Sequence, residues 1–155
     1  ARQAEIARQK EAERQAELAR RREAERQAEL QKFVDLGLPS GTLWKNVNED
    51  TEYTYDDAVS KFGKKVPTKQ QFEELINKCT WTWTGNAYRV TGPNGNSIFL
   101  PACECQGVPL CAYFLSSTLI DSKHVYVLYI DSRPVKKMYN TYRPWSERVR
   151  LVYNP

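Results

Sequence analysis

Residues 1–32 carry a twelve-residue repeat, and this repeat restricts the fold more than any other feature of the sequence. The two copies, at 7–18 and 19–30, read ARQKEAERQAEL and ARRREAERQAEL. The segment has no aromatic residue, no Gly and no Pro, and its Ala, Glu, Gln, Arg and Leu residues all favour helix. Opposite charges recur three or four residues apart, as in Glu11/Arg14, and each such pair stabilises an isolated helix by about 0.2–0.5 kcal/mol. The sequence therefore predicts a charged α-helix over residues 1–32 that needs little tertiary packing.

The role of this helix stays open on the sequence alone. A twelve-residue period fits neither the 3.5-residue nor the 3.67-residue seam of a regular supercoil. The large apolar residues Ile6, Leu18 and Leu30 advance by about 120° around an ideal helix from one copy to the next. We therefore consider three roles: a solvated spacer, a weak coiled coil that would join copies of the chain into a homo-oligomer and, least favoured, a binding role of the helix's own.

All 18 aromatic residues lie in residues 33–155, so the globular domain must be there. This part has 14 basic and 12 acidic residues, a balance that argues against nucleic acid as a partner because phosphate binding normally requires a strongly basic face. No apolar run approaches the length of a membrane span, and no secretory signal is visible, so we expect no direct membrane insertion. Because the sequence starts at Ala1 rather than Met, we expect a longer native chain, and the compartment is not predicted.

Residues 33–155 show the signals of an α+β domain. Thr54 and Thr68 each precede apolar residues at helical spacing, with a capping residue three positions on, which predicts two short capped helices. The Asn94-Gly95 pair between two β-prone runs predicts a hairpin. Short strands are also predicted on both sides of the Pro39-Ser40-Gly41 turn and, in the second half, at 111–117, 124–131, 135–142 and 147–153. Helices followed by a strand-rich half are typical of the α+β class.

The residues with the most reactive side chains do not form a catalytic motif. The four cysteines lack a paired CxxC motif, which leaves free thiols, a disulfide and, least favoured, a zinc site; they are Cys79, Cys103, Cys105 and Cys111. The single histidine, His124, has no obvious Ser or Cys partner in the sequence, so we interpret it as a ligand contact or an exposed strand end. Neither a GxGxxG loop nor a P-loop is present. We expect no catalytic residue, no metal and no cofactor.

Several motifs occur together in an order that resembles a known family. They are VDLGLPSGTLW at 34–44, VPTKQQFEELINKCTWTW at 66–83, YRVTGPNGNSIFLPA at 88–102, SST at 116–118 and VRLV at 149–152. In this order they resemble the Fibrobacter succinogenes major paralogous domain type of gut Bacteroidetes. The resemblance covers nearly all of residues 33–155, and the deviations from the family pattern concentrate in 103–148.

This resemblance implies a C-type-lectin-like fold, related to the formylglycine-generating enzymes and used mostly for ligand binding by cell-surface or phage-encoded proteins. The sequence also resembles the variable proteins of diversity-generating retroelements, in which a rewritten C-terminal segment forms the binding surface. The cysteines do not map onto the catalytic pair of the formylglycine-generating enzymes. The calcium-binding triplets of sugar-binding lectins are missing, so calcium-dependent sugar binding is not expected.

We therefore predict a non-enzymatic, receptor- or adhesin-like domain at residues 33–155, with a helix at 1–32, that binds a protein or a glycan. Aromatic anchors would supply most of the affinity, and charged and amide groups would set specificity. The predicted binding face consists of Tyr113, Phe114, Asp121, Lys123, His124, Lys137, Tyr139, Asn140, Tyr142, Trp145 and Glu147.

Two alternatives belong to other classes. In the first, the helix oligomerises and the domain is a passive cap of a structural or assembly protein. In the second, Cys103, Cys105 and Cys111 bind copper or zinc in an oxidative enzyme.

Overall fold

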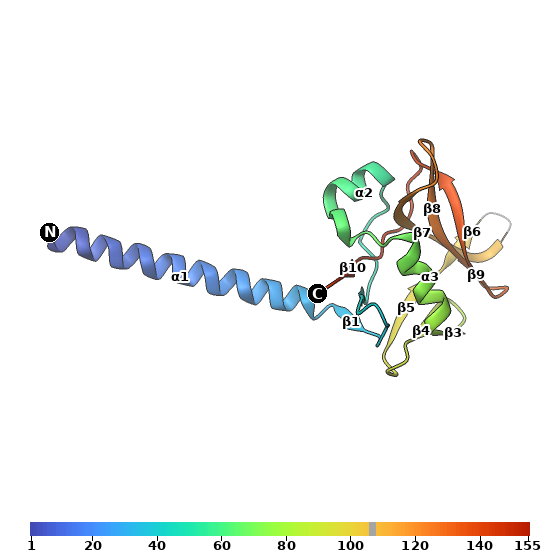
Figure 1. The fold of residues 1–155 in the computed structure, drawn as a ribbon, viewed down its shortest axis with the longest axis horizontal. Coiled ribbons are helices and arrows are strands. Elements are labelled where there is room, and N and C mark those ends of the chain that lie inside the picture. Colours follow the sequence, from blue (N-terminus) through green and yellow to red (C-terminus); the bar gives the residue numbers. More distant parts are fainter. Residues whose placement is uncertain (106–107) are drawn as a thin grey trace. The chain divides into compact units, whose positions relative to one another are not determined.

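The computed structural model describes residues 1–105 and 108–155, without the side chains of Cys105, Val108 and Pro109, and divides the chain into Ala1–Lys32 and Phe33–Pro155. The first unit is the predicted helix, α1 (Arg2–Leu30), in which no residue is buried (Figure 1). Its surface carries the expected ion pairs, among them Glu17 with Arg20 at 2.7 Å and with Arg21 at 3.2 Å. The helix is thus stabilised by its own side chains, as its repeat predicts.

The second unit begins with a small antiparallel sheet and two capped helices. The sheet has the order β1-β2-β10 and consists of β1 (Phe33–Asp35), β2 (Leu43–Lys45) and β10 (Val152–Tyr153). The helices α2 (Tyr55–Phe62) and α3 (Lys69–Lys78) are joined through the short 3-10 helix η1 (Gly63–Lys65). The Thr54 side chain caps α2, and Thr68 forms a capping box with Gln71 at the start of α3. Both predicted helices are confirmed, together with their caps.

A second antiparallel sheet, of order β3-β4-β5, contains the predicted hairpin. Its strands are β3 (Thr80–Trp83), β4 (Ala87–Thr91) and β5 (Ser97–Pro101). The hairpin turn packs on the end of β1, where Asn94 Nδ2 and Asn96 Nδ2 both donate to the Asp35 carbonyl. Gly92 approaches the same segment so closely that a Cβ there would lie 1.9 Å from the Leu36 carbonyl oxygen.

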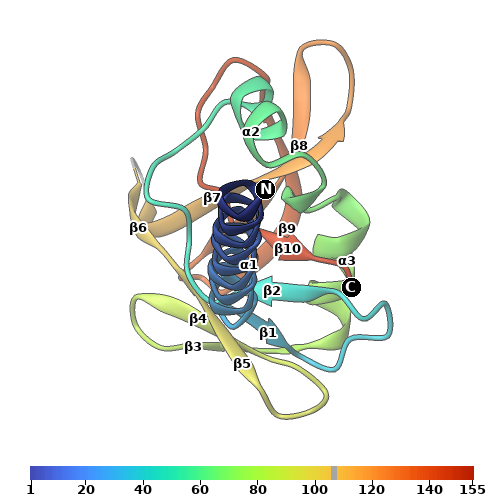
Figure 2. The ribbon, with the colours of Figure 1, turned by 90° about the vertical axis from the view of Figure 1, so that its left-hand side faces the viewer.

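The third sheet is the largest and has the order β6-β7-β8-β9, with all neighbours antiparallel. It consists of β6 (Cys103–Cys105), β7 (Val108–Leu119), β8 (His124–Asp131) and β9 (Val135–Tyr142). In Figure 2, the β1-β2-β10 sheet lies between the β3-β5 strands and the β7-β9 strands. The two faces of the third sheet pack into different parts of the core: Phe114 and Leu128 join the cluster of Trp44 and Phe72, whereas Val125 and Val127 join that of Val66 and Val149.

The predicted strand at 147–153 is wrong in extent, since only Val152–Tyr153 belongs to a sheet. The preceding residues are extended but change partners along the chain: Glu147 bridges Tyr53, and Arg148 bridges Phe114. Arg150 is fully buried, and its guanidinium donates to Asn48 Oδ1 and to the carbonyls of Lys45 and Phe99. This segment therefore connects separate parts of the domain instead of extending one sheet.

Candidate ligand-binding site

The register of the third sheet brings polar side chains into one row across three strands. Tyr113 on β7 lies opposite Tyr129 on β8, and Tyr129 lies opposite Lys137 on β9. Because residues i and i+2 of a strand share a face, Tyr139 continues the row along β9. Further along this face Val125 and Val127 are buried, so the row lies where the covered part of the face ends.

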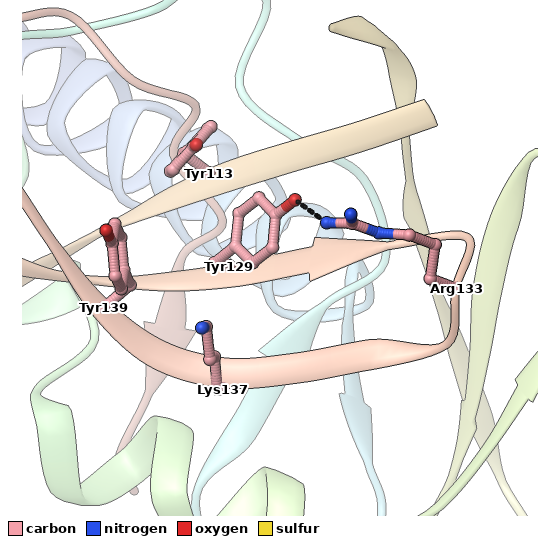
Figure 3. A pocket seen from close by; sticks show the side chains of 5 residues that line it. All are labelled: Tyr113, Tyr129, Arg133, Lys137 and Tyr139. Atoms are coloured by element: carbon pink, nitrogen blue, oxygen red, sulfur yellow. Dashed lines mark hydrogen bonds between the residues drawn. The ribbon is translucent and has the colours of Figure 1, made fainter. Parts of the chain in front are cut away.

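These four side chains and Arg133 line a pocket of about 210 Å³, which we call the tyrosine pocket (Figure 3). The ring centroids of Tyr113 and Tyr129 are 4.9 Å apart, and those of Tyr129 and Tyr139 are 6.3 Å apart. Arg133 comes from the turn between β8 and β9, and Lys137 Nζ lies 5.0 Å from the centroid of the Tyr139 ring. The tyrosine pocket thus combines three phenol rings with two cationic side chains.

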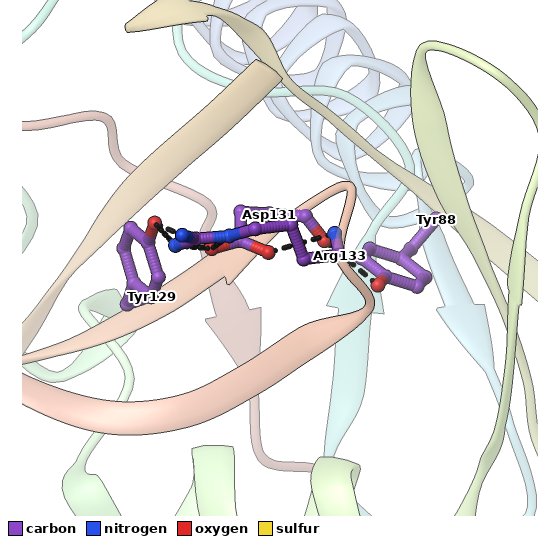
Figure 4. A network of polar contacts seen from close by, with 4 residues as sticks. All are labelled: Tyr88, Tyr129, Asp131 and Arg133. Atoms are coloured by element: carbon purple, nitrogen blue, oxygen red, sulfur yellow. Dashed lines mark hydrogen bonds and ion pairs between the residues drawn. The ribbon is translucent and has the colours of Figure 1, made fainter. Parts of the chain in front are cut away.

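Asp131, at the end of β8, holds Arg133 in place (Figure 4). The Asp131 carboxylate has no exposed surface, and it accepts hydrogen bonds from Arg133 Nη2 at 2.6 Å, Arg133 Nε at 3.1 Å and Tyr129 Oη at 2.6 Å. The Tyr88 hydroxyl donates to the Asp131 carbonyl at 2.9 Å, which ties this end of β8 to β4. A buried carboxylate with several charge-assisted hydrogen bonds fixes the side chains around it, so the wall of the pocket is preformed.

The electrostatics keep this cluster in one ionisation state near neutral pH. Hydrogen bonds from Arg133 lower the pKa of Asp131 to about 2, against the opposing effect of burial. The hydrogen bond with Asp131 raises the pKa of Arg133, and burial raises the pKa of Tyr113 and of Tyr129. The carboxylate is therefore ionised, the guanidinium is positive, and the phenols keep their protons as hydrogen-bond donors.

A second group of predicted residues lies at the opposite end of β8 and β9. The His124 ring is 4.8 Å from that of Tyr142, and the Tyr142 ring is 5.0 Å from that of Trp145. His124 Nδ1 is 2.9 Å from the Asp121 carboxylate, whose pKa is lowered chiefly by the backbone N–H of Lys123. Nearby, a pocket of about 290 Å³ is lined by Asp56, Ser122, Lys123, Tyr142, Arg143 and Pro144.

The structure therefore does not bring the predicted residues into one continuous face. Tyr139 pairs with Val127, whereas Tyr142 pairs with His124, and alternation places these two pairs on opposite faces of the sheet. Asn140 lies on the face of Tyr142 and is exposed. Phe114 is a correction: it has no exposed surface, because its side chain points into the core that Tyr113, its neighbour, faces away from.

Glu147 is not among the residues that line the tyrosine pocket, and its carboxyl has an unusual environment. Its carboxyl accepts a hydrogen bond from Thr141 Oγ1 at 3.0 Å, and burial raises its pKa to about 7, with a smaller contribution from the charge of Glu52. The same carboxyl contributes to the raised pKa of Tyr113. Glu147 is thus partly protonated at neutral pH.

Sequence reasoning missed two residues of the tyrosine pocket, Tyr129 and Arg133. Tyr129 lies in a mostly apolar run, residues 125–130 of β8, which gives it the pattern of a core residue. Arg133 lies in a predicted turn, and its role depends on Asp131 being buried two residues earlier. An acidic residue followed two positions later by Arg in a tight turn is the one local signal that could have found it.

The cysteines are divided between free and bonded states. Cys111 is disulfide-bonded, while Cys79 and Cys103 are free thiols. Burial raises the pKa of the Cys79 thiol to about 11, so this thiol is not activated as a nucleophile. The side chain of Cys105 lies outside the described part of the chain, and within that part no group of three His, Cys, Asp or Glu side chains could hold a metal ion.

The site has to be interpreted from its own chemistry. Comparison of the chain with protein-family models, with curated proteins and with solved structures finds no match. In residues 1–105 and 108–155, no helix is both long and apolar enough to cross a membrane.

Proposed function

We propose that residues 33–155 form a non-enzymatic, receptor- or adhesin-like ligand-binding domain with a C-type-lectin-like fold. The tyrosine pocket is its binding site, and its ligand is a protein or a glycan. The observation that carries the proposal is the pocket itself, in which an ordered arginine, a lysine and three tyrosines surround a space of about 210 Å³. Tyrosine and arginine are the residues that most often supply binding energy at protein surfaces.

The location of the pocket in the sequence supports a variable binding surface. All five lining residues lie within 103–148, where the chain deviates from the family that it resembles. Residues outside this segment hold it in place, as the hydrogen bond from Tyr88 to Asp131 illustrates. This division is the one expected of a variable protein of a diversity-generating retroelement, with a constant scaffold and a changing face. A reverse-transcriptase gene beside this gene, with a near-copy of the 3′ end that differs mainly at adenines, would establish that part of the proposal.

Binding is tested by screening the labelled full chain against an array of glycans and a panel of purified cell-surface proteins. For any ligand found, Tyr139→Ala should weaken binding at least tenfold, because it removes a ring that is 47% exposed at the rim of the pocket. Phe99→Ala is the matched control, since this ring is 49% exposed on β5 and does not line the pocket.

Equal binding by Tyr139→Ala and the unchanged chain, with the fold intact, would show that the tyrosine pocket is not the site. Replacing Tyr142 and Trp145 by Ala would then test the second aromatic group, at the other end of β9.

A further inference from the structure

The unpaired polar groups in the tyrosine pocket are hydrogen-bond donors. Among the described residues, the hydroxyls of Tyr113 and Tyr139 make no hydrogen bond, and the Tyr129 hydroxyl already donates to Asp131. Arg133 uses Nε and Nη2 toward Asp131 and Tyr129, which leaves Nη1 directed to no partner within the described part of the chain. Lys137 adds three further N–H donors. A ligand that satisfies these groups must present acceptor oxygens.

The charge of the pocket is positive by about one unit. The Arg133 guanidinium is neutralised by Asp131, whose pKa of about 2 keeps it ionised. Lys137 is exposed, and in the parts of the chain that are described no carboxylate lies within 4.0 Å of its Nζ. The carboxyl of Glu147, whose charge reaches Tyr113, has a pKa of about 7 and so carries a full charge only above neutrality. An anionic group beside Lys137 would therefore meet an unneutralised cation.

The dimensions of the pocket limit the size of the ligand. At about 210 Å³ the space lies below the roughly 300–1,000 Å³ of pockets for drug-sized ligands, so one small ring fits and a longer molecule would extend into solvent. The Tyr113 and Tyr139 rings come from the two strands that flank β8, and both lie near the Tyr129 ring (Figure 3), so the three rings provide apolar contact area for the body of a sugar ring. The hydrogen-bond donors of the pocket can bind the hydroxyl oxygens of a sugar, and its phenol rings can pack against the apolar C–H face of the sugar ring.

We infer that the tyrosine pocket binds an acidic sugar, a pyranose ring with a carboxylate that pairs with Lys137 and Arg133. This inference rests on the proposed function and specifies the ligand class. The carboxylate accepts from Lys137 Nζ and from the free Nη1 of Arg133, the ring lies against Tyr139, and the sugar hydroxyls accept from the phenols. Because Asp131 already holds the guanidinium, little conformational freedom of the Arg133 side chain is lost on binding.

The test is a titration of the full chain with D-glucuronate at pH 6, in which binding is monitored through the amide chemical shifts in two-dimensional NMR spectra. D-glucose is the neutral ring of the same size, and acetate is the carboxylate without the ring. We expect glucuronate to bind at least fivefold more tightly than either, with the shifts concentrated on β7, β8 and β9. Raising the ionic strength should weaken glucuronate binding, because Lys137 is exposed and its charge is screened.

The decisive variant is Lys137→Met, which keeps most of the side-chain volume and removes the charge. It should weaken glucuronate binding at least fivefold and leave glucose binding unchanged. Lys136→Met is the matched control: this lysine is also exposed, but its Nζ lies over Trp81 on the opposite face of β9, and its loss should change affinity by less than twofold.

Three results would overturn the inference. If glucose binds the pocket as tightly as glucuronate, or if Lys137→Met leaves glucuronate binding intact, the ligand is not an acidic sugar, although the proposed binding function stands. If neither sugar shifts the pocket resonances and a ligand from the screen is insensitive to Tyr139→Ala, both the inference and the proposed function are wrong.

Discussion

Replacing Glu147 by Gln should stabilise the domain at neutral and alkaline pH. The carboxyl is largely withdrawn from water, and its folded-state pKa is raised from 4.5 to about 7. Between these two values the folded chain retains a proton that the unfolded chain has lost, so the free energy of unfolding falls as the pH rises from 4.5 through 7 and then levels off. The amide of Gln carries no charge, so the variant avoids this loss while keeping an oxygen that can accept from Thr141 Oγ1.

The magnitude follows from the shift of the pKa. One pKa unit corresponds to about 1.4 kcal/mol, so a shift of this size in a fully enclosed carboxyl would cost roughly 3 kcal/mol. Glu147 keeps part of its contact with solvent, which screens its charge, and we therefore expect about half of that value, ~1–2 kcal/mol. At pH 4, where the folded carboxyl is protonated and the unfolded one is mostly protonated, the variant and the unchanged chain should be equally stable within about 0.5 kcal/mol.

Guanidinium chloride unfolding measures this difference, with fluorescence of the four Trp residues, all in residues 33–155, as the readout. The experiment compares the chain and Glu147→Gln at several pH values from 4 to 8. The matched control is Glu104→Gln, because Glu104 is exposed on β6 and its replacement should change the free energy of unfolding by less than about 0.5 kcal/mol. A Glu147→Gln difference that stays the same at pH 5 and pH 8, or that favours Glu at pH 8, would refute the reasoning.

Three further changes test other parts of the structure. Gly92→Ala should lower the free energy of unfolding by at least ~3 kcal/mol, because the new Cβ would lie 1.9 Å from the Leu36 carbonyl oxygen. The control, Gly41→Ala, should cost about 1 kcal/mol, since Gly41 has a φ of 76° but open space around it. Equal losses in the two variants would contradict the close approach at Gly92. Asp131→Asn should lower the free energy of unfolding by ~1–2 kcal/mol above pH 4. The difference from the unchanged chain should shrink as the pH falls toward 2, where Asp131 itself takes up a proton. A difference in chemical unfolding that does not depend on pH would argue against the ion pair with Arg133. Residues 33–155 alone should sediment as a monomer, so any self-association of residues 1–155 would depend on α1. If residues 33–155 associate without residues 1–32, the hypothesis that the helix joins copies of the chain is wrong.

The local parts of the fold could be predicted because their signals lie within a few residues of each other. The caps at Thr54 and Thr68 and the turn at Asn94-Gly95 depend on neighbours in the sequence, and the structure has all three. The binding face could not be predicted as fully, because the side of the sheet on which a residue lies depends on pairing with distant strands. Tyr113 and Phe114 are adjacent and both aromatic, yet one lines a pocket and the other is enclosed.

The roles of two charged residues could not be predicted for the same reason, since they too depend on groups that are not local in the sequence. Arg133 looks like an ordinary turn residue until burial of Asp131 gives it a fixed partner. Arg150 looks like a surface residue of a short strand, but its guanidinium is enclosed and burial lowers its pKa to about 9. In both cases a group distant in the sequence, or the packing of the whole domain, decides the role of a charged side chain.

The position of β9 at one end of the sheet order has a consequence for engineering. Alternation along this strand separates Lys137 and Tyr139, which line the pocket, from Met138, which packs against the core. A library randomised at 137 and 139, with Met138 held constant, would change the chemistry of the pocket while keeping the packing that supports it. Directed evolution of new specificities could thus proceed on this scaffold with few variants lost to misfolding.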